Sequence, residues 1–171
     1  MSLNIGVVMD PIAQIKPWKD TTLAMLLEAQ RRGWTLHYME PADLYVRDGR
    51  VFAVTSDLTV RDDNQDWFTL GEPAPRDLTG MDMILMRQDP PFDAAYLYAT
   101  YLLEKVEREG VLVANRPASV RDSNEKLFAT DFPQCCVPTL VSGRAALLRE
   151  FVKEQGDTVM KPLDAMGGTN V

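Results

Sequence analysis

An arginine and several polar residues follow predicted strands at positions where a sheet can hold a ligand. Arg87 comes directly after the apolar segment 81–86, and polar segments at 10–12 and 115–117 follow two other predicted strands. Open parallel sheets bind ligands beyond the carboxyl ends of their strands. Because a guanidinium can bind a carboxylate through two parallel hydrogen bonds, Arg87 is a candidate carboxylate-binding residue. The alternative is an ordinary surface salt bridge, for example to Asp89.

Two lysines form a second candidate site. Lys161 follows Val159 and Met160 at the end of a predicted strand 158–161, and Lys126 lies on a predicted helix 124–129. Two ammonium groups that face one cleft repel each other unless an anion lies between them. A triphosphate is such an anion, and each charged hydrogen bond to it would contribute roughly 1.5–3 kcal/mol. Taken singly, each lysine reads as an ordinary solvated surface charge.

The segment from Asp164 to Gly168, with the sequence DAMGG, is a candidate phosphate-binding turn. Backbone N–H groups of successive turn residues can bind phosphate oxygens. The alternative is a plain turn, since a pair of glycines alone is a weak signal.

Several other kinds of site are disfavoured by the residues present. The only histidine, His37, lies in the second predicted strand, and we interpret it as structural. The only cysteines, Cys135 and Cys136, are adjacent, so we expect a reduced pair in a loop and neither a disulfide framework nor a zinc site. The chain contains neither the G-x-G-x-x-G motif of dinucleotide-binding proteins nor a P-loop.

Alternating strands and helices predict an α/β fold with a parallel, Rossmann-like sheet. Asp20 and Asp93 are predicted to cap two helices that end at Gly33 and Gly110. The predicted strands are 3–9, 36–39, 81–86 and 111–114. For the second helix, the predicted buried face consists of Ala95, Tyr98, Ala99, Leu102 and Val106.

Two parts of the chain depart from this alternation. Between 41 and 78, a turn at 47–50 predicts a hairpin of 44–46 with 51–55, and the insertion as a whole reads as a solvent-exposed flap or an oligomer contact. After 116–123 the pattern changes to the helix 124–129, strands 137–141 and 158–161, and a helix that ends at Gly156. We therefore predict two domains, 1–122 and 123–171.

The charge and hydropathy of the sequence disfavour two kinds of binding partner, nucleic acids and membranes. The chain has 171 residues and a net charge of −7, from 25 acidic and 18 basic residues. This balance disfavours binding to nucleic acid, which requires clustered Lys and Arg. The sequence has no apolar run long enough to cross a membrane and no recognisable leader, so we expect no membrane association and a cytoplasmic location.

A set of strings in fixed order carries a family resemblance: VVMDPI, LLEAQRRGW with LHYME, ILMRQDPPFD, YATYLLE, RDSNEKLFAT and MKPLDAMGGT. Together they closely resemble the bacterial glutathione synthetases of the ATP-grasp superfamily. The resemblance runs from residue 3 to 171. It is strongest at 5–45, 81–130 and 159–169, and weakest in the segment 46–78. It implies that 1–122 is the substrate-binding, pre-ATP-grasp domain and that 123–171 begins an ATP-grasp domain.

The resemblance also implies an activity and its site residues. Members of the family join γ-glutamylcysteine to glycine with ATP and Mg²⁺, through an acyl phosphate, and self-association is expected. By resemblance, Arg87 helps to bind γ-glutamylcysteine, and Lys126 and Lys161 contact the nucleotide. The turn of Ala165, Met166, Gly167 and Gly168 would close over its phosphates, although Ala165 stands where the family pattern leads us to expect glycine.

The family's magnesium ligands, second ATP-grasp subdomain and large flexible loop are expected downstream of Val171. We therefore expect an N-terminal fragment with no catalytic and no metal-binding residue of its own, unable to catalyse ligation alone. Two alternatives stay open. One is a different ATP-grasp carboxylate–amine ligase, against which the loop 87–93 argues. The other is a non-catalytic module that keeps the fold.

Overall fold

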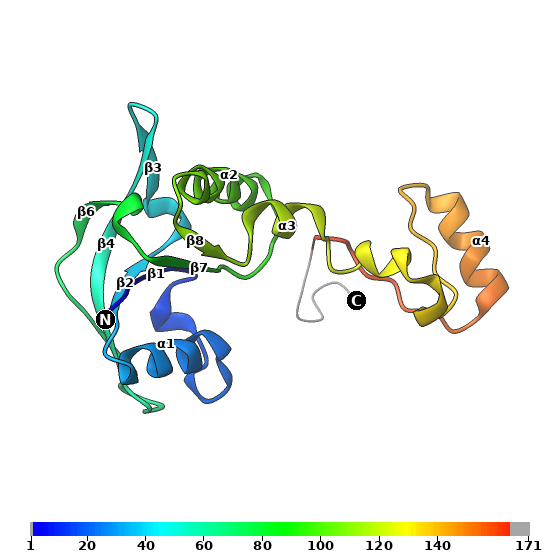
Figure 1. Cartoon of the computed structure of the whole chain (residues 1–171). Helices are drawn as coiled ribbons and strands as arrows, with labels where there is room; N and C mark the ends of the chain where they lie inside the picture. The colour runs from blue at the N-terminus through cyan, green and yellow to red at the C-terminus, as the bar shows by residue number, and fades with distance from the viewer. Residues whose placement is uncertain (1, 165–171) are drawn as a thin grey trace.

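Four of the segments predicted as strands form the parallel part of one sheet. The computed structural model describes residues 2–164 (Figure 1). Its parallel strands are β1 (Asn4–Met9), β2 (Thr35–Met39), β7 (Met83–Arg87) and β8 (Leu112–Ala114). β1 lies between β2 and β7, with Ile5 opposite Leu36 on one side and Met83 on the other. The sheet order β3-β4-β2-β1-β7-β8 confirms the predicted α/β class.

The segment between β2 and β7 extends this sheet with antiparallel strands. They are β3 (Leu44–Arg47), β4 (Arg50–Val60), β5 (Phe68–Leu70) and β6 (Ala74–Asp77), and β4 pairs with the other three and with β2. The predicted hairpin is confirmed: Asp48 and Gly49 have φ of 51° and 80° in a two-residue turn. The interpretation of the insertion as an exposed flap is wrong for β4, whose alternate residues are buried, whereas most of residues 61–77 are exposed.

Two helices cover opposite faces of the sheet, as Figure 1 shows. α1 (Thr21–Arg31) lies on one face, and α2 (Ala94–Arg108) lies on the other, beside α3 (Pro117–Asp122). Both predicted caps are confirmed. Asp20 Oδ1 accepts a hydrogen bond of 2.7 Å from Leu23 N, and Asp93 Oδ1 accepts one of 2.9 Å from Tyr96 N.

Alternate residues of each central strand point to opposite faces of the sheet and belong to two separate hydrophobic cores. Ile5 and Val7 of β1 pack with Leu26 of α1, whereas Val8 packs with Leu103 of α2. This two-residue period, together with burial on both faces, accounts for the nearly continuous apolar runs in the sequence.

The predicted buried face of α2 is wrong for part of its length. Ala99 and Val106 are buried, but Ala95 is exposed, Tyr98 is 63% exposed and Leu102 is only partly buried. The buried set is Tyr96, Ala99, Thr100, Leu103 and Val106. Apolar residues occur on two adjacent faces of this helix, so their spacing is compatible with burial of either face. Packing against the sheet buries the face that contains Tyr96 and Leu103.

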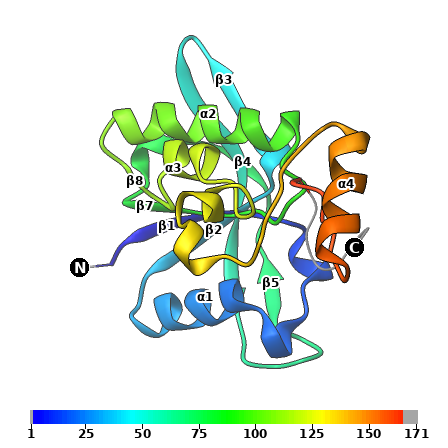
Figure 2. The same cartoon turned by 90° about the vertical axis from the view of Figure 1, so that its right-hand side faces the viewer.

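After α3 the chain leaves the sheet and forms a separate segment of loops and helices, which faces the viewer in Figure 2. α4 (Ala145–Gln155) confirms the predicted helix, and Gly156 just beyond it has φ of 76°. Short 3-10 helices are also present at Ile12–Gln14, Pro17–Lys19, Pro41–Asp43, Leu78–Gly80, Phe128–Asp131 and Pro133–Cys135.

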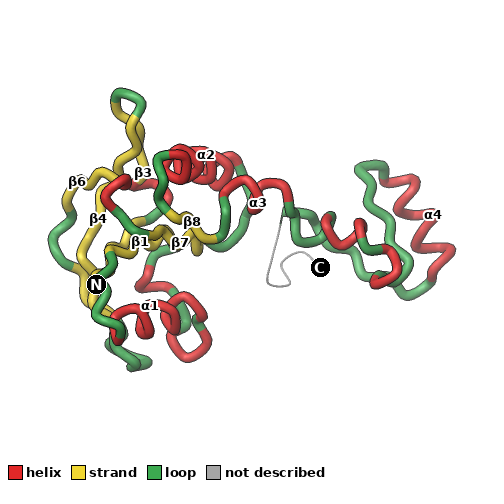
Figure 3. The backbone as a smooth tube through the Cα atoms, in the orientation of Figure 1, coloured by secondary structure: helices red, strands yellow, loops and turns green. Residues whose placement is uncertain are grey.

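Three predictions for this segment are wrong. Residues 137–141 and 158–161 are not strands, and 124–129 is a turn followed by a 3-10 helix, so Figure 3 shows no strand beyond β8 in the described chain. A strand needs a partner for its backbone groups, and neither segment has one in residues 2–164. Within this range, no residue after α3 is buried, and Val159 and Met160 are 69% and 66% exposed.

None of the helices in residues 2–164 combines the length and apolar character that spanning a bilayer requires.

Candidate functional site

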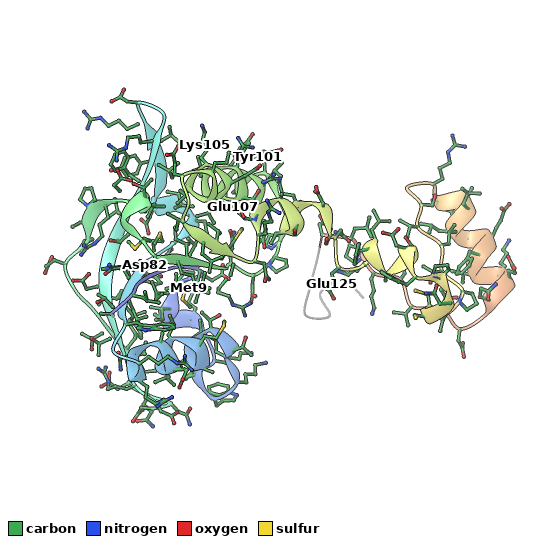
Figure 4. All side chains as sticks on the ribbon, in the orientation of Figure 1. Met9, Asp82, Tyr101, Lys105, Glu107 and Glu125 are labelled. Carbon is green, nitrogen blue, oxygen red and sulfur yellow. The ribbon has the colours of Figure 1, made fainter. Side chains whose placement is uncertain are left out.

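A polar cavity of about 550 Å³ lies at the carboxyl ends of β1 and β7, where the sequence predicted a ligand. Met9 at the end of β1 is labelled in Figure 4 and marks this edge of the sheet. The first helix begins at the same edge, so residues of the β1–α1 connection also face the cavity. Its lining residues are Met9, Asp10, Pro11, Gln14, Ile15, Lys16, Lys19, Asp20, Thr21, Thr22, Arg87, Asp89 and Pro90.

Arg87 is the last residue of β7 and is held at this edge by the first turn of α1. Its Nε donates a hydrogen bond of 3.0 Å to Thr22 Oγ1, and its Nη2 donates one of 2.9 Å to Thr21 Oγ1. Neither hydroxyl neutralises the guanidinium, and no ion pair joins Arg87 to Asp89 or to another carboxylate within residues 2–164. The guanidinium is therefore oriented toward the cavity with its charge available to an anionic ligand.

The loops after β1 and β7 are joined through two aspartates. The backbone N–H of Asp89 donates a hydrogen bond of 2.7 Å to Asp10 Oδ2. Burial raises the pKa of the Asp89 carboxyl above its ordinary value; the neighbouring Asp10 carboxylate adds to this rise, and Arg87 opposes it. The cavity thus contains carboxylates crowded together beside a guanidinium.

The charges that line the cavity balance. Lys16, Lys19 and Arg87 supply three positive charges, and Asp10, Asp20 and Asp89 supply three negative ones. Asp20 is already engaged as the cap of α1. A cavity with both signs of charge suits a small zwitterionic ligand better than a simple anion or an apolar one.

A second cavity, of about 400 Å³, lies where the sheet part meets the segment after α3. Pro90 lines both cavities, so the two are neighbours along one edge of the molecule. Glu125, labelled in Figure 4, marks this place. The lining residues are Pro90, Phe92, Tyr96, Asn115, Ser119, Val120, Ser123, Asn124, Glu125, Lys126, Leu163 and Asp164.

The two candidate lysines are placed differently. Lys126 lines the second cavity from a turn, where its backbone N–H donates a hydrogen bond of 3.1 Å to Asn124 Oδ1. Lys161 is exposed and lines neither cavity. The segment just after Lys161 does reach this place, because Asn124 Nδ2 donates a hydrogen bond of 3.0 Å to Leu163 O. Ala165, Met166, Gly167 and Gly168 lie outside the described residues.

Sequence reasoning missed Thr21, Thr22, Lys16 and Lys19 as lining residues. A signal was present: Asp20 was identified as a helix cap, and the first helix after a parallel strand begins at the carboxyl edge of the sheet. No group of three or more His, Cys, Asp or Glu side chains within residues 2–164 is arranged to hold a metal ion.

These features define an α/β protein with a polar cavity at the carboxyl edge of its sheet. The family model described as prokaryotic glutathione synthetase, N-terminal domain, matches residues 3–121, and the model for the ATP-grasp domain of the same enzymes matches residues 125–171. The chain belongs to the prokaryotic glutathione synthetase family.

Individual glutathione synthetases are similar in sequence to this chain over nearly its whole length. The glutathione synthetase of Pseudomonas putida is 56% identical over 171 residues, which are 100% of this chain and 54% of the relative. That of Yersinia pestis is 53% identical over 99% of this chain and 53% of the relative, and that of Coxiella burnetii is 49% identical over 100% and 53%. The chain spans about half the length of the curated relatives it matches.

Proposed function

We propose that this chain supplies the γ-glutamylcysteine-binding domain and the beginning of the nucleotide-binding domain of a glutathione synthetase. The enzyme would join γ-glutamylcysteine to glycine. ATP transfers its γ-phosphoryl group to the cysteine carboxylate and leaves as ADP. The amine of glycine then attacks the acyl carbon, phosphate leaves, and the nitrogen loses a proton.

The observation that carries this proposal is the position of Arg87 in the first cavity. Its guanidinium is held by Thr21 and Thr22, stands without a carboxylate partner in residues 2–164, and faces a cavity large enough for a small ligand. Bidentate binding of a dipeptide carboxylate is the interaction for which arginine is suited. Family membership makes γ-glutamylcysteine the dipeptide to test.

The division into domains 1–122 and 123–171 belongs to this proposal. Both apolar cores are built from residues before 122, and none of the described residues from 123 to 164 is buried. The second cavity lies at the junction of the two parts and adjoins the first at Pro90. A substrate held by Arg87 could therefore present its reacting carboxylate toward the nucleotide-binding part.

Nucleotide binding is assigned to Lys126, Lys161 and the turn from Ala165 to Gly168, with Lys126 in the second cavity as the supporting observation. The family implies Mg²⁺ as well. Within residues 2–164, no group of three or more His, Cys, Asp or Glu side chains is arranged to hold a metal ion, so this range supplies no Mg²⁺ site. Self-association and a cytoplasmic location complete the proposal.

A chimaera tests this function. Residues 1–171 of this chain would replace the matching 54% of the Pseudomonas putida glutathione synthetase, leaving the remainder of that enzyme in place. We expect the folded chimaera to form glutathione from γ-glutamylcysteine, glycine and ATP, and the 171-residue chain alone to form none. A folded chimaera that ligates other substrates but not γ-glutamylcysteine would favour a different ligase. A folded chimaera with no ligase activity would favour a non-catalytic module.

A further inference from the structure

Two carboxylates in the first cavity have unused hydrogen-bonding capacity. Asp10 uses only Oδ2, to accept the backbone N–H of Asp89. Within residues 2–164, the carboxylate of Asp89 has neither a hydrogen bond nor an ion pair, although Arg87 lies only two residues away. Oppositely charged groups therefore line one cavity without pairing to each other.

This arrangement leaves the two carboxylates without a direct cationic partner, although the positive and negative side chains that line the cavity are equal in number. Asp89 is an exposed residue of the cavity lining; partial desolvation and the Asp10 carboxylate raise the pKa of its carboxyl, and Arg87 opposes this rise. Lys16 and Lys19 line the same cavity but form no ion pair with the aspartates in the described chain. A ligand ammonium group would supply the hydrogen-bond donors that these two carboxylates lack, and a carboxylate on the same ligand would bind the guanidinium of Arg87.

We propose that Asp10 and Asp89 bind the free α-ammonium group of the ligand, while Arg87 binds a carboxylate of the same ligand. The first cavity is then a site for the amino-acid end of a γ-glutamyl compound, in which ammonium and carboxylate share one carbon atom. This inference rests on the proposed function and extends it, because it names the part of the dipeptide that the cavity recognises.

The consequence is selectivity for a free amino group. A site built to hydrogen-bond a polar group rejects an analogue that lacks it, since its own polar groups then lose their partner. Glutarylcysteine is γ-glutamylcysteine with hydrogen in place of the α-ammonium group and is otherwise identical. Any difference in binding between the two ligands therefore reports on the ammonium site alone.

Calorimetric titration of the full chain with both ligands tests the proposal. We expect the wild-type chain to bind γ-glutamylcysteine at least about tenfold more tightly than glutarylcysteine, since hydrogen bonds to charged groups have this magnitude. Asp89→Asn and Asp10→Asn should each reduce this ratio to about threefold or less. Asparagine keeps the shape of the side chain and, at position 10, an acceptor for the Asp89 N–H.

Asp82→Asn provides the matched control. Asp82 lies just before β7 (Figure 4), at the opposite end from Asp89, and its Oδ2 accepts a hydrogen bond of 2.7 Å from Asn4 N. This variant should keep the wild-type ratio. The proposal is overturned if the wild-type chain binds both ligands equally, or if Asp89→Asn and Asp10→Asn weaken both ligands by the same factor. Failure of the wild-type chain to bind either ligand would instead overturn the proposed function, and the inference with it.

Discussion

Arg87 on β7 and Thr22 on α1 are 65 positions apart in the chain and are joined by a hydrogen bond of 3.0 Å between Arg87 Nε and Thr22 Oγ1. Thr22 is only 4% exposed, so its hydroxyl is a fixed acceptor. The first turn of α1 thereby sets the direction in which the guanidinium meets the cavity. Thr22 is a positioning residue for Arg87 and need not touch the ligand itself.

Thr22→Val should weaken γ-glutamylcysteine binding by about 2- to 10-fold, the range expected when one hydrogen bond of ordinary strength is lost. Valine keeps the volume of threonine but cannot accept the Arg87 N–H. Titration of the two proteins with the dipeptide measures the effect. Thr100→Val is the matched control, because Thr100 is also fully buried and its hydroxyl also accepts from an arginine, Arg121. Equal losses of affinity in both variants would contradict the positioning role.

Lys161→Ala in the chimaera should raise the KM for ATP and leave the KM for γ-glutamylcysteine within about twofold. The reason is that an ammonium group bound to phosphate contributes a charged hydrogen bond that alanine cannot make. Steady-state kinetics with each substrate varied in turn measures both constants. Lys153→Ala, which removes a charge from the exposed last turn of α4, should change neither. Unaltered ATP dependence in Lys161→Ala would remove Lys161 from the nucleotide site.

Gly6→Ala should destabilise the fold by about 1–3 kcal/mol. A Cβ at Gly6 would lie 3.0 Å from Met39 Cε and 3.3 Å from Ile84 Cγ1, and both of these side chains are fully buried. Gly80→Ala is the control, since nothing lies within 4 Å of its Cβ position. Urea denaturation at one pH measures both variants. Equal stability of Gly6→Ala and the wild-type chain would show that β1 does not pack as closely as described.

The buried His37 should make the stability of the chain depend on pH. His37 Nδ1 lies 3.0 Å from Asp57 Oδ1, which also accepts a hydrogen bond of 2.8 Å from Arg76 Nη2. Burial lowers the pKa of His37 below its ordinary value of about 6.5, the Arg76 charge lowers it further, and Asp57 opposes both. Below pH 6.5 the unfolded chain therefore binds a proton that the folded chain does not, so stability should fall as the pH drops through this range.

This dependence can be measured without interference from other histidines, because the chain has only one. The imidazole signal should titrate with a midpoint below 6.5 in NMR spectra of the folded chain. The free energy of unfolding should fall more between pH 7.5 and 5.5 for the wild-type chain than for His37→Asn, which retains an amide near the Asp57 carboxylate. A midpoint at or above 6.5 would contradict this account.

The elements that could be predicted from the sequence are those whose signals are local. The caps Asp20 and Asp93 bind backbone groups three residues ahead, and the turn at 48–49 needs only two residues with positive φ. The position of Arg87 at a strand end followed from the apolar run before it. Each of these features depends on neighbours in the sequence, so one sequence suffices to find it.

The features that could not be predicted depend on distant partners. Residues 158–161 are apolar enough for a strand, but a strand also requires a neighbour to pair with, and the sequence does not say where one lies. The spacing of apolar residues in α2 predicts a buried face that includes Tyr98, but a second apolar face that includes Tyr96 is the one that packs on the sheet. The contact of Arg87 with Thr22 joins two elements 65 positions apart, and only the packing of α1 on the sheet brings them together.

The central claim is that γ-glutamylcysteine binds at the carboxyl ends of β1 and β7 and that Arg87 holds it. Titration of the ¹⁵N-labelled chain with this dipeptide, followed by NMR, tests it most directly. The account predicts saturable shifts of the Asp10, Thr22 and Asp89 amides, with affinity at least about tenfold lower in Arg87→Ala. Shifts confined to other parts of the chain, or equal affinity in Arg87→Ala, would contradict it.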